Sequence, residues 1–140
     1  MFTSRERAYL ADQVLGRLAT VDARGRPHVV PVGYHHDPET DTILVGGRRF
    51  GASRKYRDAR DRRHVALVVD DLASTDPWRP RGIEVRGLAE AVTRSGRPPE
   101  RPDDAMIRIT PTRIVAWGID TDPFGPPRAR DVDPEPSGPG

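Results

Sequence analysis

A run of cations around a single lysine is the first feature that could bind a ligand. Between Arg48 and Arg63 the chain carries eight Lys or Arg residues against two Asp, a local net charge of +6, and Lys55 is the only lysine of the protein. Ser53 stands directly before Arg54 and Lys55 and has a side chain typical of a helix N-cap. A helix N-terminus with neighbouring cations suits a phosphate group. The alternative is a solvated basic face, which an arginine-rich composition also produces.

A second candidate is the segment Asp76 to Pro80, in which Trp78 and Arg79 lie between two prolines. A Trp ring can cover a planar heterocycle, and a guanidinium can stack on a ring or pair with an anion. The alternative is a loop anchor that packs on its own sheet. We interpret the other tryptophan, Trp117, as a core residue of the last strand.

Metal binding and nucleophilic catalysis find no support in the residue pattern. The histidines have no metal-ligand spacing, and the neighbours His35 and His36 point to opposite faces of an extended chain. We therefore assign surface or packing positions to all four (His28, His35, His36, His64) and predict no metal site. No serine lies in a Gly-x-Ser-x-Gly elbow, and the chain has no cysteine that could act as a nucleophile or form a disulfide.

Short strands must hold these segments in place. Thr3 and Glu6 fit a capping box before a helix at about 4–13, and Gly46 and Gly47 end a strand before a helix that starts at Ser53. Pro31 cannot donate to a strand ladder, so we expect its N side at an edge or a bulge. The predicted strands cover 16–22, 27–35, 42–46, 64–69, 82–92 and 106–118, and the predicted loops cover 35–41, 70–80 and 94–103.

This pattern predicts a mainly β protein, a small closed or split β-barrel with about six strands and two to three short helices. A doubly wound dinucleotide fold would need long alternating helices and a Gly-x-Gly-x-x-Gly turn, which are missing. We assign residues 1–119 to one barrel domain. Residues 120–140 are rich in proline and glycine, and we predict a disordered tail there.

Composition and charge exclude some classes of binding partner. The formal net charge of +2 is too small to indicate a nucleic-acid-binding protein. No run of about 18 apolar residues occurs, and the first residues lack the apolar stretch of a signal peptide. We therefore expect a soluble, cytoplasmic protein that binds neither nucleic acid nor membrane.

Several motifs together resemble the pyridoxamine 5′-phosphate oxidase-like superfamily, and within it the deazaflavin-dependent branch. The resemblance covers roughly residues 5–119 and depends on the order and spacing of the motifs. They are Leu-Ala-Thr-Val at 18–21, Gly-Arg-Pro-His-Val-Val-Pro-Val at 25–32, Lys-Tyr-Arg-Asp at 55–58, the strand 65–71, Asp-Pro-Trp-Arg at 76–79, Gly-Ile-Glu-Val-Arg-Gly at 82–87, Ile-Arg-Ile-Thr-Pro at 107–111 and Trp-Gly at 117–118.

The resemblance implies a split β-barrel of the FMN-binding type, a homodimer with two cofactor sites between the subunits. It places the cofactor ring along the backbone near Pro31 and Val32, and Trp78 of the partner beside the ring. Gly46 and Gly47 would permit close backbone approach. The phosphate would lie against Ser53, Arg54 and Lys55, with Arg60 nearby.

The same resemblance implies an oxidoreductase that passes a hydride between reduced deazaflavin, coenzyme F420, and a small electrophilic acceptor. Because F420 extends its ribityl phosphate with an acidic tail, the +6 segment favours it over FMN, which stays the alternative cofactor. The residues that bind a pyridoxal phosphate substrate cannot be placed, so vitamin B6 synthesis is disfavoured. Two other readings stay open: an FMN-binding electron carrier or sensor, and a cofactor-free barrel that binds an anionic partner.

Overall fold

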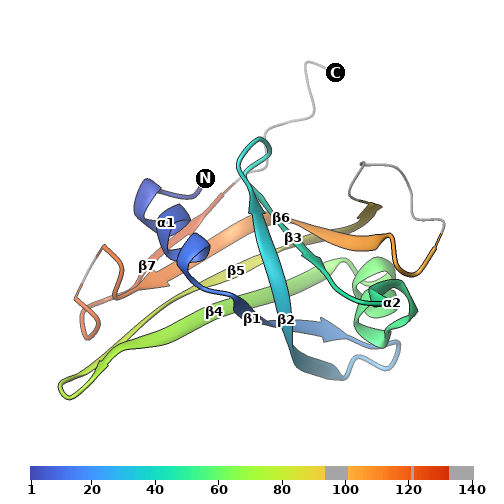
Figure 1. Cartoon of the computed structure of the whole chain (residues 1–140). Coiled ribbons are helices and arrows are strands. Elements are labelled where there is room, and N and C mark those ends of the chain that lie inside the picture. The colour runs from blue at the N-terminus through green and yellow to red at the C-terminus, as the bar shows by residue number, and fades with distance from the viewer. Residues whose placement is uncertain (94–100, 121, 133–140) are drawn as a thin grey trace.

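The computed structural model describes residues 1–93, 101–120 and 122–132, in which seven antiparallel strands curl around one core (Figure 1). Two α-helices and one short 3-10 helix complete the described chain. In chain order the elements are α1 (Ser4–Asp12), β1 (Leu15–Val21), β2 (Pro27–Asp37), β3 (Thr42–Gly46), η1 (Phe50–Ala52), α2 (Arg54–Asp61), β4 (His64–Thr75), β5 (Trp78–Thr93), β6 (Ala105–Trp117) and β7 (Arg128–Asp131).

The sheet closes into a barrel through a pairing between strands that are distant in sequence. The strand order is β3-β2-β1-β4-β5-β6-β7, and β3 also pairs with β6 through Ile43 opposite Ile109 and Val45 opposite Ile107. These four side chains are fully buried. The structure confirms the predicted mainly β split barrel, with seven strands in the described residues where about six were expected.

Strand alternation decides which side chains fill the barrel. In β4 the inward residues are Val65, Leu67 and Val69, whereas the residues between them are half-buried, so the strand is covered more fully on its inner face. In β6 Thr112 is an extra residue opposite the Arg86–Gly87 step of β5, and this bulge moves the inward positions from odd to even numbers.

Two segments expected to be loops extend strands instead. β2 continues through His35 and His36 to Asp37, and β4 and β5 run on to a tight hairpin, so the irregular loop predicted for 70–80 is wrong. Asp71 pairs across this hairpin with Arg81, whose guanidinium donates to both carboxylate oxygens at 2.8 and 3.0 Å. The polar residues of 70–80 predicted that the strands end there. Cross-strand ion pairs, however, stabilise polar residues within an exposed two-stranded ribbon.

The described part of the C-terminal segment is folded. β7 pairs with β6, and Arg130 reaches Glu6 of α1, so the predicted disordered tail is wrong up to Val132. Residue 121 and residues 133–140, the rest of that prediction, lie outside the described residues, as does most of the predicted loop 94–103. Neither described α-helix is long and apolar enough to cross a membrane.

Both predicted helices are confirmed, with the caps that the sequence indicated. At α1 the Thr3 hydroxyl accepts from the Glu6 N–H at 3.1 Å, and the Glu6 carboxylate accepts from the Thr3 N–H at 2.8 Å. At α2 the Ser53 hydroxyl accepts from the Tyr56 N–H at 3.3 Å. In Figure 1 α1 lies beside β7, and α2 lies at the opposite end of the barrel.

Candidate functional site

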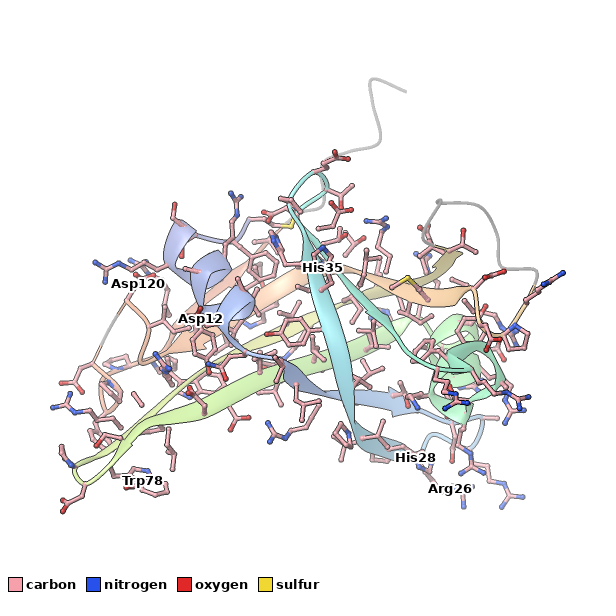
Figure 2. The ribbon with its side chains drawn as sticks, in the orientation of Figure 1. Asp12, Arg26, His28, His35, Trp78 and Asp120 are labelled. Carbon is pink, nitrogen blue, oxygen red and sulfur yellow. The ribbon has the colours of Figure 1, made fainter. Side chains whose placement is uncertain are left out.

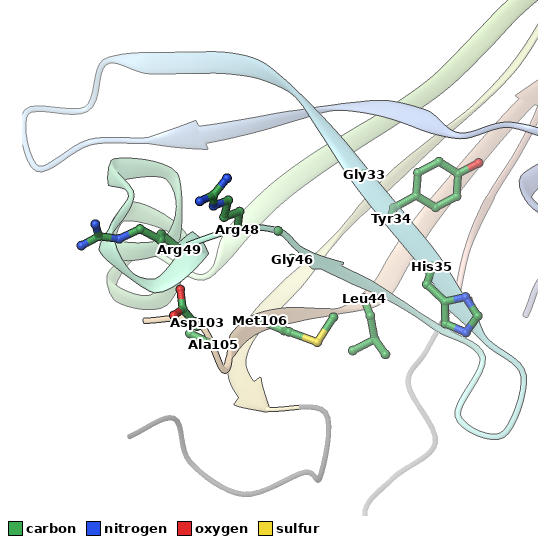
Figure 3. A pocket seen from close by; sticks show the side chains of 11 residues that line it. Gly33, Tyr34, His35, Leu44, Gly46, Arg48, Arg49, Asp103, Ala105 and Met106 are labelled. Carbon is green, nitrogen blue, oxygen red and sulfur yellow. The ribbon is translucent and has the colours of Figure 1, made fainter. Parts of the chain in front are cut away.

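A groove of about 610 Å³ crosses the outer face of β2 and β3 and reaches the start of β6 (Figure 3). The strand register explains its position, because Gly33 pairs with Gly46 and His35 pairs with Leu44, so these residues share one face. The lining residues are Gly33, Tyr34, His35, Leu44, Gly46, Gly47, Arg48, Arg49, Asp103, Ala105 and Met106.

The middle of the groove is apolar and has little side-chain bulk. Leu44 and Met106 form its floor between the two ends in Figure 3. A Cβ added to Gly33 or Gly47 would meet no atom within 4 Å, whereas one added to Gly46 would lie 3.0 Å from the Met106 Cε. Two open glycines and an apolar floor leave room for a flat ring to approach the backbone.

One end of the groove is cationic. Arg48 and Arg49 line it, and Arg49, with a φ of 53°, turns the chain into η1 and on toward α2. In the described chain no carboxylate lies within ion-pair distance of five cations of this region: Arg48, Arg49, Arg54, Lys55 and Arg57. Asp103 is the one acid among the described residues that line the groove. The positive charge of this end is therefore available to an anion.

Of the predicted site residues, Gly46 and Gly47 line the groove, and Pro31 and Val32 lie next to its Gly33. Pairing of β2 with β3 begins only at Gly33, so Pro31 lies where one side of β2 is unpaired, as expected for an edge. The Val32 side chain is buried in the core. Only the backbone of Val32 can therefore face a ligand.

The predicted phosphate residues are Ser53, the N-cap of α2, and three cations of that helix, and none of them lines the groove itself. Lys55 is half-buried, with its ammonium nitrogen 5.5 Å from the centroid of the Phe50 ring. The Ser53 hydroxyl is engaged locally, because it also donates to the Phe50 carbonyl at 2.5 Å. Arg60 pairs with Asp61 at 2.9 Å. The exposed cations Arg54 and Arg57 complete this side of the helix.

Within one chain, Trp78 and Arg79 lie away from the groove. Both are exposed at the start of β5, beside the turn of the β4–β5 hairpin, and Figure 2 places Trp78 at the end of the molecule away from α2. Trp117 lies over Gly82, where an added Cβ would be 2.4 Å from the Trp117 ring. Trp117 is only half-buried, so the prediction that it is a core residue is wrong.

His35 lines the groove, whereas the sequence predicted only a surface or packing position for it. It points outward, whereas His36 points inward and bonds Asp41 at 2.7 Å. His28 is likewise engaged, with Asp22 at 2.9 Å, and this contact is the main cause of the low pKa of Asp22. The signal that could have identified His35 is the hairpin register, since the continuation of β2 places it opposite Leu44.

The neighbouring tyrosine is part of the scaffold. The Tyr34 hydroxyl donates to the Leu10 carbonyl at 2.6 Å, and burial raises its pKa to about 12. Tyr34 therefore ties β2 to α1 and stays protonated, with its ring directed away from the groove in Figure 3.

The fold is a split β-barrel, and the groove on its outer face combines an apolar floor with a cationic end. The sequence model of the family described as pyridoxamine 5′-phosphate oxidase matches residues 2–118. The chain belongs to this family.

One relative is much more similar than the solved structures described below. The chain is 46% identical over 139 residues, covering 98% of this chain and 97% of the relative, to a 5a,11a-dehydrotetracycline/5a,11a-dehydrooxytetracycline reductase of Streptomyces rimosus subsp. rimosus.

The structural neighbours support the fold alone. A conserved hypothetical protein of Mycobacterium tuberculosis has a TM-score of 0.67 at 19% identity, with 86% of each chain covered. An FAD binding protein of Mycobacterium smegmatis has a TM-score of 0.60 at 20% identity, with 82% of this chain and 93% of that chain covered.

Proposed function

We propose that the protein is an F420-dependent oxidoreductase that transfers a hydride between reduced deazaflavin and an electrophilic acceptor, a polycyclic conjugated ketone related to dehydrotetracycline. The family and the reductase at 46% identity support an oxidoreductase. The observation that carries the choice of cofactor is the groove, in which an apolar floor joins a cluster of cations without carboxylate partners in the described chain.

The residues present fit such a cofactor. Gly33 and Gly47 leave open space above the strands for the ring, and Lys55, Arg54 and the N-terminus of α2 offer charge and N–H groups to a phosphate. When bound, the deazaflavin supplies the hydride chemistry itself. The chain's own contribution is to bind the phosphate, hold the ring against β2 and β3, and orient the acceptor.

The acidic tail of F420 distinguishes it from FMN. In addition to Lys55, the exposed cations Arg48, Arg49 and Arg57 have no ion-pair partner among the described residues. Together they carry more positive charge than a single phosphate would pair with. Additional anionic groups on the ligand would use this charge. We therefore rank F420 above FMN.

The proposal includes a homodimer in which Trp78 and Arg79 of the partner flank the ring. Its support is an apolar outer face on β2, β1 and β4, where Val29, Ala19 and Ala66 lie in one row and Val29 is 65% exposed. Leu15 and Trp78, each 55% exposed, add to the exposed apolar surface. A second copy would cover this surface and bring a distant hairpin near the groove.

The dimer is tested by analytical ultracentrifugation of the wild type and of Val29→Glu, with Arg24→Glu in the exposed β1–β2 turn as the matched control. We expect a dimer for the wild type and the control and a monomer for Val29→Glu. A monomeric wild type at micromolar concentration would contradict the proposed assembly.

Fluorescence titration tests the choice of cofactor. Purified protein should quench F420 fluorescence with micromolar affinity and bind FMN more weakly. Reduced F420 should then support reduction of a dehydrotetracycline acceptor. Lack of micromolar binding to both cofactors would refute the proposal.

The second candidate is an FMN-binding electron carrier or sensor, which the same open glycines and cations allow. It predicts a yellow protein on purification and FMN affinity above that for F420. Strongly salt-dependent binding of another polyanion without affinity for either cofactor would instead favour a cofactor-free barrel.

A further inference from the structure

His35 occupies the end of the groove opposite Arg48 and Arg49 (Figure 3). Its imidazole is exposed and makes no hydrogen bond or ion pair within the described residues. Two of the other histidines, His28 and His36, are bonded to carboxylates. His35 is therefore a polar group without a hydrogen-bond partner in the described chain, at the edge of the apolar floor formed by Leu44 and Met106.

The two ends of the groove differ in chemistry, and this difference gives a bound ligand its direction. An anionic group belongs at the end with Arg48 and Arg49, and a flat ring belongs over Leu44 and Met106. An acceptor stacked on the open face of that ring would extend past it at the groove end away from Arg48 and Arg49. His35 lies at that end of the lining.

Other side chains near this end are already engaged. Leu44 pairs with His35 on one side and with Arg108 of β6 on the other. The Arg108 guanidinium donates to Asp37 at 3.1 Å, Thr40 at 2.8 Å and Thr42 at 2.7 Å. The Tyr34 hydroxyl is bonded to α1. Among the described lining residues of this end, His35 is left to bond a ligand.

We propose that His35 is a specificity-determining residue that donates a hydrogen bond to a carbonyl oxygen of the acceptor. This inference rests on the proposed function and names the residue that recognises the acceptor class. An N–H donor at the carbonyl oxygen binds and orients a conjugated ketone, and an acceptor without a carbonyl would leave the imidazole unpaired.

The test measures acceptor binding without cofactor, with tetracycline as the probe because it carries the ring system and the conjugated carbonyl groups of the proposed acceptor. The variants are His35→Leu, which removes the donor, and His35→Gln, which keeps an N–H. His64→Leu is the control, because His64 is also an exposed histidine but lies outside the groove lining.

Tetracycline affinity by fluorescence titration should fall about tenfold in His35→Leu, as expected for one lost hydrogen bond. His35→Gln should recover most of the affinity, and His64→Leu should match the wild type. With reduced F420 and a dehydrotetracycline acceptor, the His35→Leu change should raise KM more than it lowers kcat. F420 affinity should stay within about twofold of the wild type in all variants.

Three results would overturn the inference: equal tetracycline affinity in His35→Leu and the wild type, no binding of tetracycline to the wild type, or no recovery in His35→Gln. The last result would assign His35 a role in shape alone. Failure of the proposed function is distinguishable, because it would appear as loss of F420 and FMN binding in the wild type.

Discussion

Arg130 of β7 donates two hydrogen bonds to the carboxylate of Glu6 in α1, at 3.0 and 2.6 Å, and Glu6 is fully buried. Arg130 also donates to the Met1 carbonyl. One side chain thus joins the last described strand to the first helix, across 124 residues of sequence. Because Tyr34 in turn ties α1 to β2, this ion pair supports the strand that carries His35.

Replacement of Arg130 by Met should lower the free energy of unfolding by about 3–5 kcal/mol, since the Glu6 carboxylate would stay buried without its cation. Urea unfolding followed by circular dichroism measures the change. Arg113→Met is the matched control, because its ion pair with Asp131 also holds β7, there to β6 and in an exposed position, and should contribute about 1 kcal/mol or less. Equal effects of the two substitutions would contradict the importance of the buried pair.

Stability should fall in acid. Burial would raise the pKa of Glu6, but the hydrogen bonds from Arg130 and Thr3 outweigh it and lower the pKa, and Arg81 above all lowers the pKa of Asp71. Unfolded carboxyls titrate near pH 4, so below about pH 5 the unfolded chain binds more protons than the folded one. The free energy of unfolding should be steady from pH 6 to 7 and should decrease from about pH 5 to 3. Urea unfolding at each pH tests this, and Glu6→Gln should flatten the dependence.

Lys55→Ala should weaken F420 binding by about 1–3 kcal/mol if the ammonium group bonds the phosphate. Arg24→Ala, which removes an exposed cation of the β1–β2 turn, should leave the affinity unchanged at moderate salt. Fluorescence titration of both variants separates a specific contact from general positive charge. Wild-type affinity in Lys55→Ala would remove this residue from the site.

Gly33→Val should reduce cofactor affinity at least tenfold while leaving the thermal unfolding temperature within a few degrees of the wild type. A Cβ added at Gly33 meets no atom within 4 Å, and valine has a high β-strand propensity. The substitution should therefore leave the stability of the fold unchanged. The branched side chain would fill the groove at its Gly33–Gly46 pair. Undiminished binding would place the ring elsewhere.

The sequence by itself determined the local elements. The Thr3–Glu6 capping box predicted α1, and Ser53 predicted the start of α2, because caps and strand patterns depend on residues close in the chain. The strand pattern predicted a β-barrel, which the family resemblance specified as a split barrel, and the charge count alone identified the cation cluster around Lys55. Errors arose where polar residues were taken as chain breaks, at Asp70–Pro80 and in the C-terminal segment.

Only the tertiary structure decided how distant segments meet. The pairing of β3 with β6 forms the groove floor from Leu44 and Met106, and the bond from Arg130 to Glu6 orders a segment whose composition predicts disorder. The outward position of His35 depends on the length of β2 and on its register with β3. These contacts depend on pairing across the whole chain, and no local pattern encodes the partner of a strand.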